Sequence, residues 1–297
     1  MNNIVRGLLA AVGLCLGLMA VSAHAAEEAE NPAWTEAKAV AKAGPADITI
    51  ANQATLHLPA NRLYIPQPQA GKLLRAMGNP GEHSELSGLV FPKEGGEWFA
   101  TLRYIPSGYV KDGDAKEWKA DEMLASYKEG TEAANDERKK MGVAPIEITG
   151  WAEVPAYEAT THRLVWAMSS KEKGAPAEAG QGVNYNTFAL GREGYVSLNF
   201  ITDLKDLPGQ KPEAKALLGA LAFDPGKRYE DFNEATDKVA EYGLAALVLG
   251  VGAKKLGLFA VILAFMAKFA KVFLFAAVGL GAAASRFFGR KKATPEA

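Results

Sequence analysis

Apolar and polar residues alternate along several short stretches of this chain, which is the pattern of strands with one buried face. Residues 195–201 are the clearest case, because Val196, Leu198 and Phe200 fall on one side. The same alternation, bounded by Gly, Pro and Asn, predicts strands at 47–50, 55–58, 63–66, 89–92, 98–105, 147–151, 160–169 and 183–190.

Helical segments interrupt and follow these strands. Residues 120–141 form the most convincing helix, rich in Ala, Glu and Lys and ended by Gly142. Shorter helices are predicted at 67–77, 211–222 and 229–242. Runs of strands with one long helix inserted and helices at the end predict an α+β fold, an antiparallel sheet with helices packed on one face.

The two strands at 183–190 and 195–201 read as a hairpin around the turn Gly191-Arg192-Glu193-Gly194. An arginine in such a turn can hold a carboxylate or phosphate with two parallel hydrogen bonds. We expect Asn199 across the sheet from it. The candidate ligand-binding residues are therefore Asn184, Tyr185, Arg192 and Asn199, although an arginine in a turn is more often simply solvated.

The C-terminal region, residues 243–284, is apolar and contains no acid. A bilayer core needs about 20 apolar residues in a helix, so a transmembrane helix is predicted within 256–288. Lys268 and Lys271 lie near its middle, and three arrangements accommodate them: snorkelling around a span at 272–288, a second helix facing them, or more than one span. Ala277 and Gly281 have the spacing that allows two membrane helices to approach closely.

The N-terminus predicts export. Arg6, the apolar run 8–21 and the small-residue site Ala23-His24-Ala25 form a signal peptide at 1–25, with an uncleaved anchor as the alternative. A polar, flexible or loosely helical leader (26–45), an exported domain (46–242), the anchor region (243–288) and a basic cytoplasmic tail (289–297) follow. By the positive-inside rule the tail lies in the cytoplasm and the domain in the periplasm, with the protein in the inner membrane.

Charge separates the domain from the tail. From residue 243 onward there are eight Lys or Arg and one acid, a net charge of +7, whereas residues 26–242 carry 24 basic and 33 acidic residues, a net charge of −9. An acidic domain argues against nucleic acid as a partner, and the basic tail suits anionic lipid head groups. The only cysteine, Cys15, is lost with the signal peptide, so we expect no thiol chemistry and no cofactor.

Acidic and histidine side chains offer weak candidates for chemistry. Asp112 and Asp114 are spaced like the start of a calcium loop, but the required glycine and terminal glutamate are missing. We expect these acids to cap the following helix instead. His162 is expected to be packed and hydrogen-bonded in the core.

Several motifs together resemble a bacterial family of uncharacterised membrane-anchored proteins, classed as a domain of unknown function. They are GYVKDGDA at 108–115, GW at 150–151 with Pro155 and Tyr157, LVWA at 164–167, VNYN at 183–186, LGR at 190–192, YEDF at 229–232, DKVA at 237–240 and YGLA at 242–245. Glu158 departs from the family pattern, which favours Asp after the tyrosine. The resemblance implies an exported domain with a C-terminal anchor and no established activity.

Two hypotheses for function follow. The first is a non-enzymatic envelope protein that is tethered to the inner membrane and binds a protein partner, a peptidoglycan fragment or lipid, with self-association through the membrane helix as one possibility. The alternative is an anchored periplasmic hydrolase that uses Asp112, Asp114 and Glu158 with His162. It requires these side chains to meet in one pocket.

Overall fold

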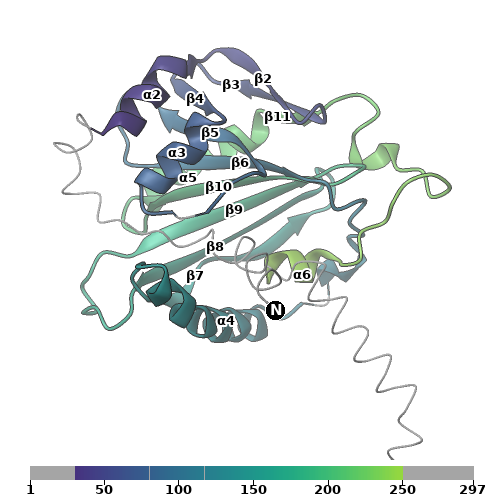
Figure 1. The fold of residues 1–297 in the computed structure, drawn as a ribbon. Helices are drawn as coiled ribbons and strands as arrows, with labels where there is room; N and C mark the ends of the chain where they lie inside the picture. The colour runs from purple at the N-terminus through teal and green to yellow at the C-terminus, as the bar shows by residue number, and fades with distance from the viewer. Residues whose placement is uncertain (1–30, 80, 117, 250–297) are drawn as a thin grey trace, which may run out of the picture. The chain divides into compact units, whose positions relative to one another are not determined.

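The computed structural model describes residues 31–79, 81–116 and 118–249. It contains an eight-stranded antiparallel sheet in the order β1-β4-β5-β6-β10-β9-β8-β7 and a three-stranded sheet in the order β11-β3-β2 (Figure 1). The strands are β1 (Lys42–Ala43), β2 (Ala46–Ile50), β3 (Ala54–Leu58), β4 (Arg62–Pro66), β5 (Leu86–Pro92), β6 (Phe99–Ile105), β7 (Ile146–Glu158), β8 (Arg163–Glu172), β9 (Gly182–Leu190), β10 (Tyr195–Asp203) and β11 (Leu221–Phe223). The helices are α2 (Pro32–Val40), α3 (Gln69–Ala76), η2 (Gly113–Lys116), α4 (Ala120–Lys140), α5 (Leu207–Gly219), η3 (Tyr229–Asp231) and α6 (Leu244–Val248).

The predicted antiparallel sheet and its hairpin are confirmed. Strands β9 and β10 pair from Tyr195 with Leu190 to Asp203 with Gly182, and the Gly191 N–H closes the turn on the Gly194 carbonyl at 2.8 Å. Strand β10 also pairs with β6 on its other side, so the hairpin lies in the middle of the sheet. Both of its strands are therefore enclosed by neighbouring strands.

One face of the large sheet packs against the small sheet and α5. Val196, Leu198 and Phe200 are fully buried there, as their alternation predicts. Leu217 of α5 and Leu56 of β3 belong to the same core. Burial of aliphatic and aromatic side chains of this size stabilises the fold by about 1.5–3 kcal/mol each.

The opposite face carries two separate apolar clusters. Helices α2 and α3 cover β4 and β5, and the buried apolar residues there form the α3 cluster: Ala37, Ile65, Ala70, Leu73, Leu74, Leu86 and Leu89. Helices α4 and α6 cover β7, β8 and β9, and the buried apolar residues there form the α4 cluster: Val110, Met123, Leu164, Trp166, Leu190, Tyr195, Tyr229, Leu244, Leu247 and Val248. Figure 1 shows α3 and α4 over opposite ends of the sheet. The prediction of helices on one face only is wrong, because strands toward both ends of the sheet also carry apolar side chains on the second face, and these side chains require a cover.

The ends of the domain also differ from the prediction. Residues 32–40, placed in a flexible or loosely helical leader, form helix α2, which is capped by Asn31 and buries Ala37 against the α3 cluster. The helix predicted at 229–242 is absent from the described structure, which has only the short η3 there. Its C-terminal part instead pairs backbone groups with the loop after β6, which leaves them unavailable for helical bonds.

Helix α6 lies inside the predicted anchor region 243–288, yet Leu244 and Val248 are fully buried in the α4 cluster. The folded domain therefore extends past residue 242. No helix among the described residues combines the length and apolar character that a bilayer crossing requires. The signal peptide, the span within 256–288, Lys268, Lys271, Ala277 and Gly281 all lie outside the described residues.

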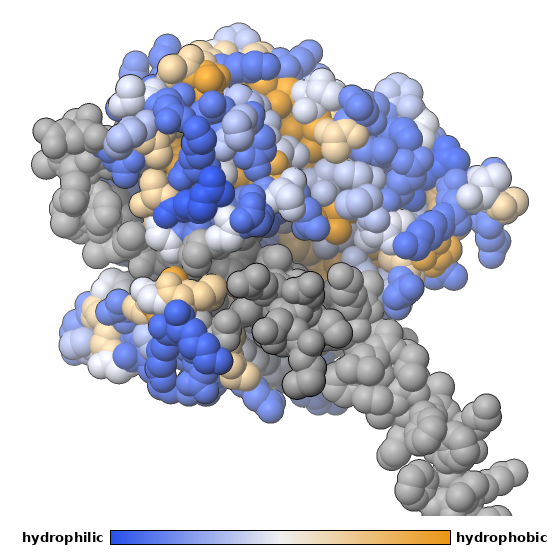
Figure 2. All heavy atoms as spheres, viewed as in Figure 1, coloured by the Kyte–Doolittle hydropathy of each residue, from blue (hydrophilic) through white to orange (hydrophobic). Residues whose placement is uncertain are grey.

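On the face shown in Figure 2, hydrophilic residues predominate over α4.

Candidate functional site

The loop that carries the GYVKDGDA motif follows β6 and holds the C-terminal part of the domain. Gly108 has φ +88°, and a Cβ there would come within 2.6 Å of the Lys238 carbonyl oxygen. The Tyr109 N–H donates to the Lys238 carbonyl and the Tyr109 carbonyl accepts the Ala240 N–H, both at 2.8 Å. Glycine is required because only it combines this conformation with so close an approach.

Aromatic rings reinforce the same contact. The Tyr109 ring stacks between Phe232, at a centroid distance of 3.8 Å, and Tyr229, at 4.3 Å. The Tyr229 hydroxyl donates to the Val110 carbonyl at 2.8 Å. Backbone pairing and ring stacking thus fix residues 229–240 on the loop.

Asp114 completes this attachment. Its carboxylate accepts the backbone N–H groups of Leu244 and Ala245, each at 3.0 Å. These are free donors at the start of helix α6, where a carboxylate also complements the helix dipole. The prediction that the acids of this loop cap the following helix is therefore wrong for Asp114, which caps a helix 130 residues later. A side chain at Gly243 would meet this carboxylate at 2.4 Å.

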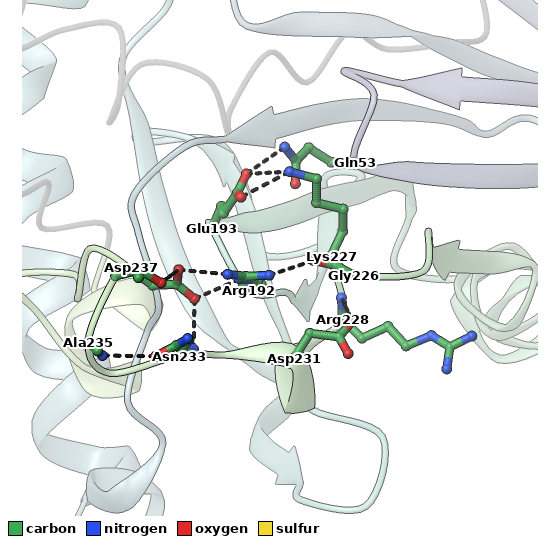
Figure 3. A network of polar contacts seen from close by, with 11 residues as sticks. Gln53, Arg192, Glu193, Gly226, Lys227, Arg228, Asp231, Asn233, Ala235 and Asp237 are labelled. Atoms are coloured by element: carbon green, nitrogen blue, oxygen red, sulfur yellow. Dashed lines mark hydrogen bonds and ion pairs between the residues drawn. The ribbon is translucent and has the colours of Figure 1, made fainter.

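The β9–β10 turn also binds the segment after β11, through side-chain contacts of Arg192 and Glu193 (Figure 3). The Arg192 guanidinium donates to both carboxylate oxygens of Asp237, at 2.6 and 2.8 Å. These hydrogen bonds hold the pKa of Asp237 well below its usual range, and the Asn233 N–H bond to the carboxylate acts in the same direction. Arg192 therefore makes the two parallel hydrogen bonds to a carboxylate that its position in the turn predicts. The carboxylate is that of Asp237 in the same chain, not that of a ligand.

Glu193 adds a further link. Its carboxylate accepts two bonds from the Lys227 ammonium and one from the Gln53 amide, all at 2.9 Å. The bond from Lys227, followed by that from Gln53, lowers the pKa of Glu193. We call the loop 108–115 and the turn 191–194, with the segment 226–248 that they hold, the C-terminal clamp.

His162 lies beside the clamp, close to Asp112 of its loop. The Tyr157 hydroxyl donates to Asp112 at 2.8 Å and lies 3.0 Å from His162 Nδ1. The His162 ring stacks on Tyr229 at 4.0 Å, so His162 is packed and hydrogen-bonded as predicted, although it lies in a turn before β8. Burial, together with the hydrogen bond to Asp112, raises the pKa of Tyr157 well above its usual range.

The acids of the hydrolase hypothesis do not meet in one place. The Asp112 carboxylate lies 3.9 Å from His162 Nδ1. Both oxygens of Asp114 are taken by helix α6, and Glu158 is exposed and accepts the Thr161 hydroxyl at 2.6 Å. Within the described residues, no group of three or more His, Asp or Glu side chains is placed to hold a metal ion.

A second polar feature lies on the sheet face between the two helix-covered clusters. Strand register places Thr101 of β6, Asn199 of β10 and Asn186 of β9 opposite one another, and each is 4% exposed. We call these three residues the polar row. Asn184 adjoins the row, since its Oδ1 accepts the Asn199 amide at 3.3 Å.

The structure divides the four predicted ligand-binding residues. Asn184 and Asn199 lie together beside the polar row. Tyr185 lies on the opposite face, because strand neighbours alternate, with Lys211 Nζ 5.9 Å from its ring centroid. Arg192 is in the clamp. The prediction that Asn199 lies across the sheet from it is wrong, because Asn199 pairs with Thr101 and Asn186. The sequence analysis does not single out Thr101 or Asn186. For Asn186 the strand period offers a signal, because residues two apart on a strand share a face and Asn186 follows Asn184 by two.

Comparison with known proteins identifies the family. Residues 42–279 match the family described as "Protein of unknown function (DUF2167)". The chain belongs to this family. The resemblance to an uncharacterised family is thereby confirmed.

Other comparisons say less about the DUF2167 chain. A comparison with curated proteins finds no match. Among solved structures, the solution structure of cyanobacterial PsbP (CyanoP) from Synechocystis sp. PCC 6803 is similar over 60% of this chain and 92% of that chain. The identity is 7% and the TM-score is 0.37.

Proposed function

We propose that this DUF2167 protein is a non-enzymatic envelope protein of the inner membrane. Its domain lies in the periplasm and binds a ligand or partner there, and an anchor within residues 243–288 tethers it. The basic tail lies in the cytoplasm, and membrane lipids are partners of Lys268 and Lys271. Ala277 and Gly281 provide a face for self-association.

The C-terminal clamp is the observation that carries this proposal. It holds the chain to the domain up to α6, and the apolar residues 250–253 and 256–267 follow in the sequence with only Lys254 and Lys255 between them. A domain joined in this way has a short connection to its tail. Such a connection suits a tether that sets the height and orientation of the domain above a membrane.

The chemistry of the clamp supports a structural role rather than catalysis. Arg192, Asp114 and Glu193 direct their charged groups at partners within the chain. A catalytic group needs an open position for substrate, whereas these groups hold one segment against another. The GYVKDGDA and LGR motifs therefore have a structural role in this domain.

Single-cysteine labelling tests the topology. In a Cys15→Ala background, Glu178→Cys places a thiol in the exposed β8–β9 loop and Ala297→Cys places one at the C-terminus. We expect a membrane-impermeant maleimide to label Glu178→Cys in intact spheroplasts and to label Ala297→Cys only after permeabilisation. Carbonate extraction should leave the protein in the membrane.

Two outcomes would overturn the proposal. Labelling of both thiols before permeabilisation would show that the tail does not cross the membrane. Labelling of neither would show that the domain is not periplasmic. The unmodified Cys15→Ala chain is the control for background labelling.

A further inference from the structure

The polar row crosses the sheet face between the two apolar clusters. On one side of it, strand register pairs Thr101 with Leu89, which belongs to the α3 cluster. On the other side it pairs Asn186 with Trp166, which belongs to the α4 cluster. A sequence of Leu, Thr, Asn, Asn and Trp thus crosses five neighbouring strands, and its three polar members span about 10 Å at the usual strand spacing.

Two side-chain atoms of this row and one beside it have no hydrogen-bond partner in the described part of the chain. Thr101 Oγ1, Asn199 Oδ1 and Trp166 Nε1 are buried without a hydrogen-bond partner among the described residues. Burying an amide, hydroxyl or indole group without a partner costs stability, and natural structures pair nearly all such groups. Apolar side chains would fill the same positions without this cost.

The unpaired groups define the chemistry of a ligand. They comprise a hydroxyl, an amide carbonyl and an indole N–H, so the ligand must offer both donors and acceptors. The row contains no carboxylate, which removes the usual partner of a cationic ligand. A hydroxyl-rich ligand with secondary amides meets these requirements: an amide N–H suits Asn199, and an amide carbonyl suits Trp166.

A peptide offers the same amide groups but fits the position less well. Extended peptides are usually bound by pairing with a free sheet edge. The row lies on β6, β10 and β9, whose backbones pair with a strand on each side. Recognition here must therefore use side chains above the sheet, which suits a sugar ring better than a strand.

We infer that the polar row binds a sugar carrying acetamido groups. This inference deepens the proposed function and rests on its claim that the domain binds a ligand. Asn199 accepts the acetamido N–H, Trp166 donates to the acetamido carbonyl, and Thr101 hydrogen-bonds a ring hydroxyl. The Asn199 amide donates to Asn184 Oδ1 at 3.3 Å, which orients its free carbonyl, and the Asn186 amide donates to the Asn184 backbone carbonyl at 3.2 Å.

Calorimetric titration of the full-length protein in a sugar-free detergent tests this assignment. The probe is N,N′,N″-triacetylchitotriose, and the matched controls are the deacetylated trimer and trialanine. We expect saturable binding of the acetylated trimer only. Thr101→Val and Asn199→Leu should each weaken binding about tenfold or more, the change expected when one well-placed hydrogen bond is lost.

A second buried threonine provides the control variant. Thr187 lies on the opposite face of β9 and donates its hydroxyl to the Leu198 carbonyl at 2.7 Å. Thr187→Val should lower Tm and leave the dissociation constant unchanged. Thr101→Val should leave Tm unchanged or raise it while weakening binding, because its hydroxyl has no partner within the described part of the chain.

Three results would overturn the inference: no saturable binding of the acetylated trimer, equal binding by Thr101→Val, or preferential binding of trialanine. None of these results bears on the labelling of the tail. Failure of the sugar site and failure of the membrane topology are therefore distinguishable.

Discussion

The carboxylate of Asp114 accepts the backbone N–H of Leu244 at 3.0 Å across 130 residues of sequence. This contact joins the loop after a central strand to α6, the last helix among the described residues. The β9–β10 turn makes a similar contact with Asp237 through Arg192. Two motifs far apart in the sequence thus hold the same C-terminal segment.

Removing the cap on α6 should loosen the end of the domain. We expect Asp114→Ala to lower the free energy of unfolding by about 1 kcal/mol, the usual effect of losing a helix N-cap. The amides of Leu244 and Ala245 should exchange faster with deuterium, because their acceptor is gone. Urea unfolding and hydrogen exchange measure the two effects.

The control for this variant is Asp136→Ala on the outer face of α4. The Asp136 side chain is 83% exposed and its ion pair with Lys139 is long, at 3.5 Å. It should change stability by less than about 0.5 kcal/mol. If Leu244 and Ala245 exchange at wild-type rates in Asp114→Ala, the cap does not hold α6.

Two glycines of the same loop should respond differently to alanine. Gly108→Ala should cost about 2 kcal/mol or more, because its φ of +88° is strained for alanine and the new Cβ meets the Lys238 carbonyl. Gly113→Ala should be neutral or stabilising by up to about 1 kcal/mol, since no atom lies within 4 Å of its Cβ position. Equal effects in chemical denaturation would contradict the close approach at Gly108.

Arginine geometry matters in the β9–β10 turn. Arg192→Lys keeps the charge but loses the two parallel bonds to Asp237, so segment 226–240 should open more often. We expect trypsin to cleave after Arg228 and Lys238 several-fold faster, as followed by mass spectrometry.

Arg75→Lys serves as the control for this experiment, since the Arg75 guanidinium donates a long hydrogen bond to the Gly81 carbonyl, at 3.3 Å. Both variants preserve the number of tryptic sites. Unchanged cleavage in Arg192→Lys would show that the arginine does not hold the segment.

The lowered pKa of Asp237 predicts acid sensitivity. Its ion pair contributes stability that is fully present above the ordinary aspartate pKa of about 3.9 and is lost as pH falls through the lowered folded-state value. Asp237→Asn should therefore lower Tm at neutral pH, and its difference from wild type should shrink below about pH 4. Parallel Tm curves between pH 7 and pH 3 would contradict this coupling.

Local sequence was sufficient for much of the sheet. The alternation at Val196, Leu198 and Phe200 predicts a strand with one buried face, and the glycines of the turn predict the hairpin. Neighbouring residues of a strand point to opposite faces of the sheet, so the sequence by itself already predicts that Tyr185 and Asn184 belong to different sites. Long-helix composition likewise predicts α4.

Contacts between distant segments depended on the tertiary structure. By itself the sequence determines which residues of a strand or helix share a face, because side-chain direction follows from backbone periodicity. It does not determine that Asp114 meets Leu244, that Arg192 meets Asp237, or that Thr101 lies beside Asn199. These neighbours depend on which segments pack together, and that choice reflects burial summed over the whole chain rather than any local pattern.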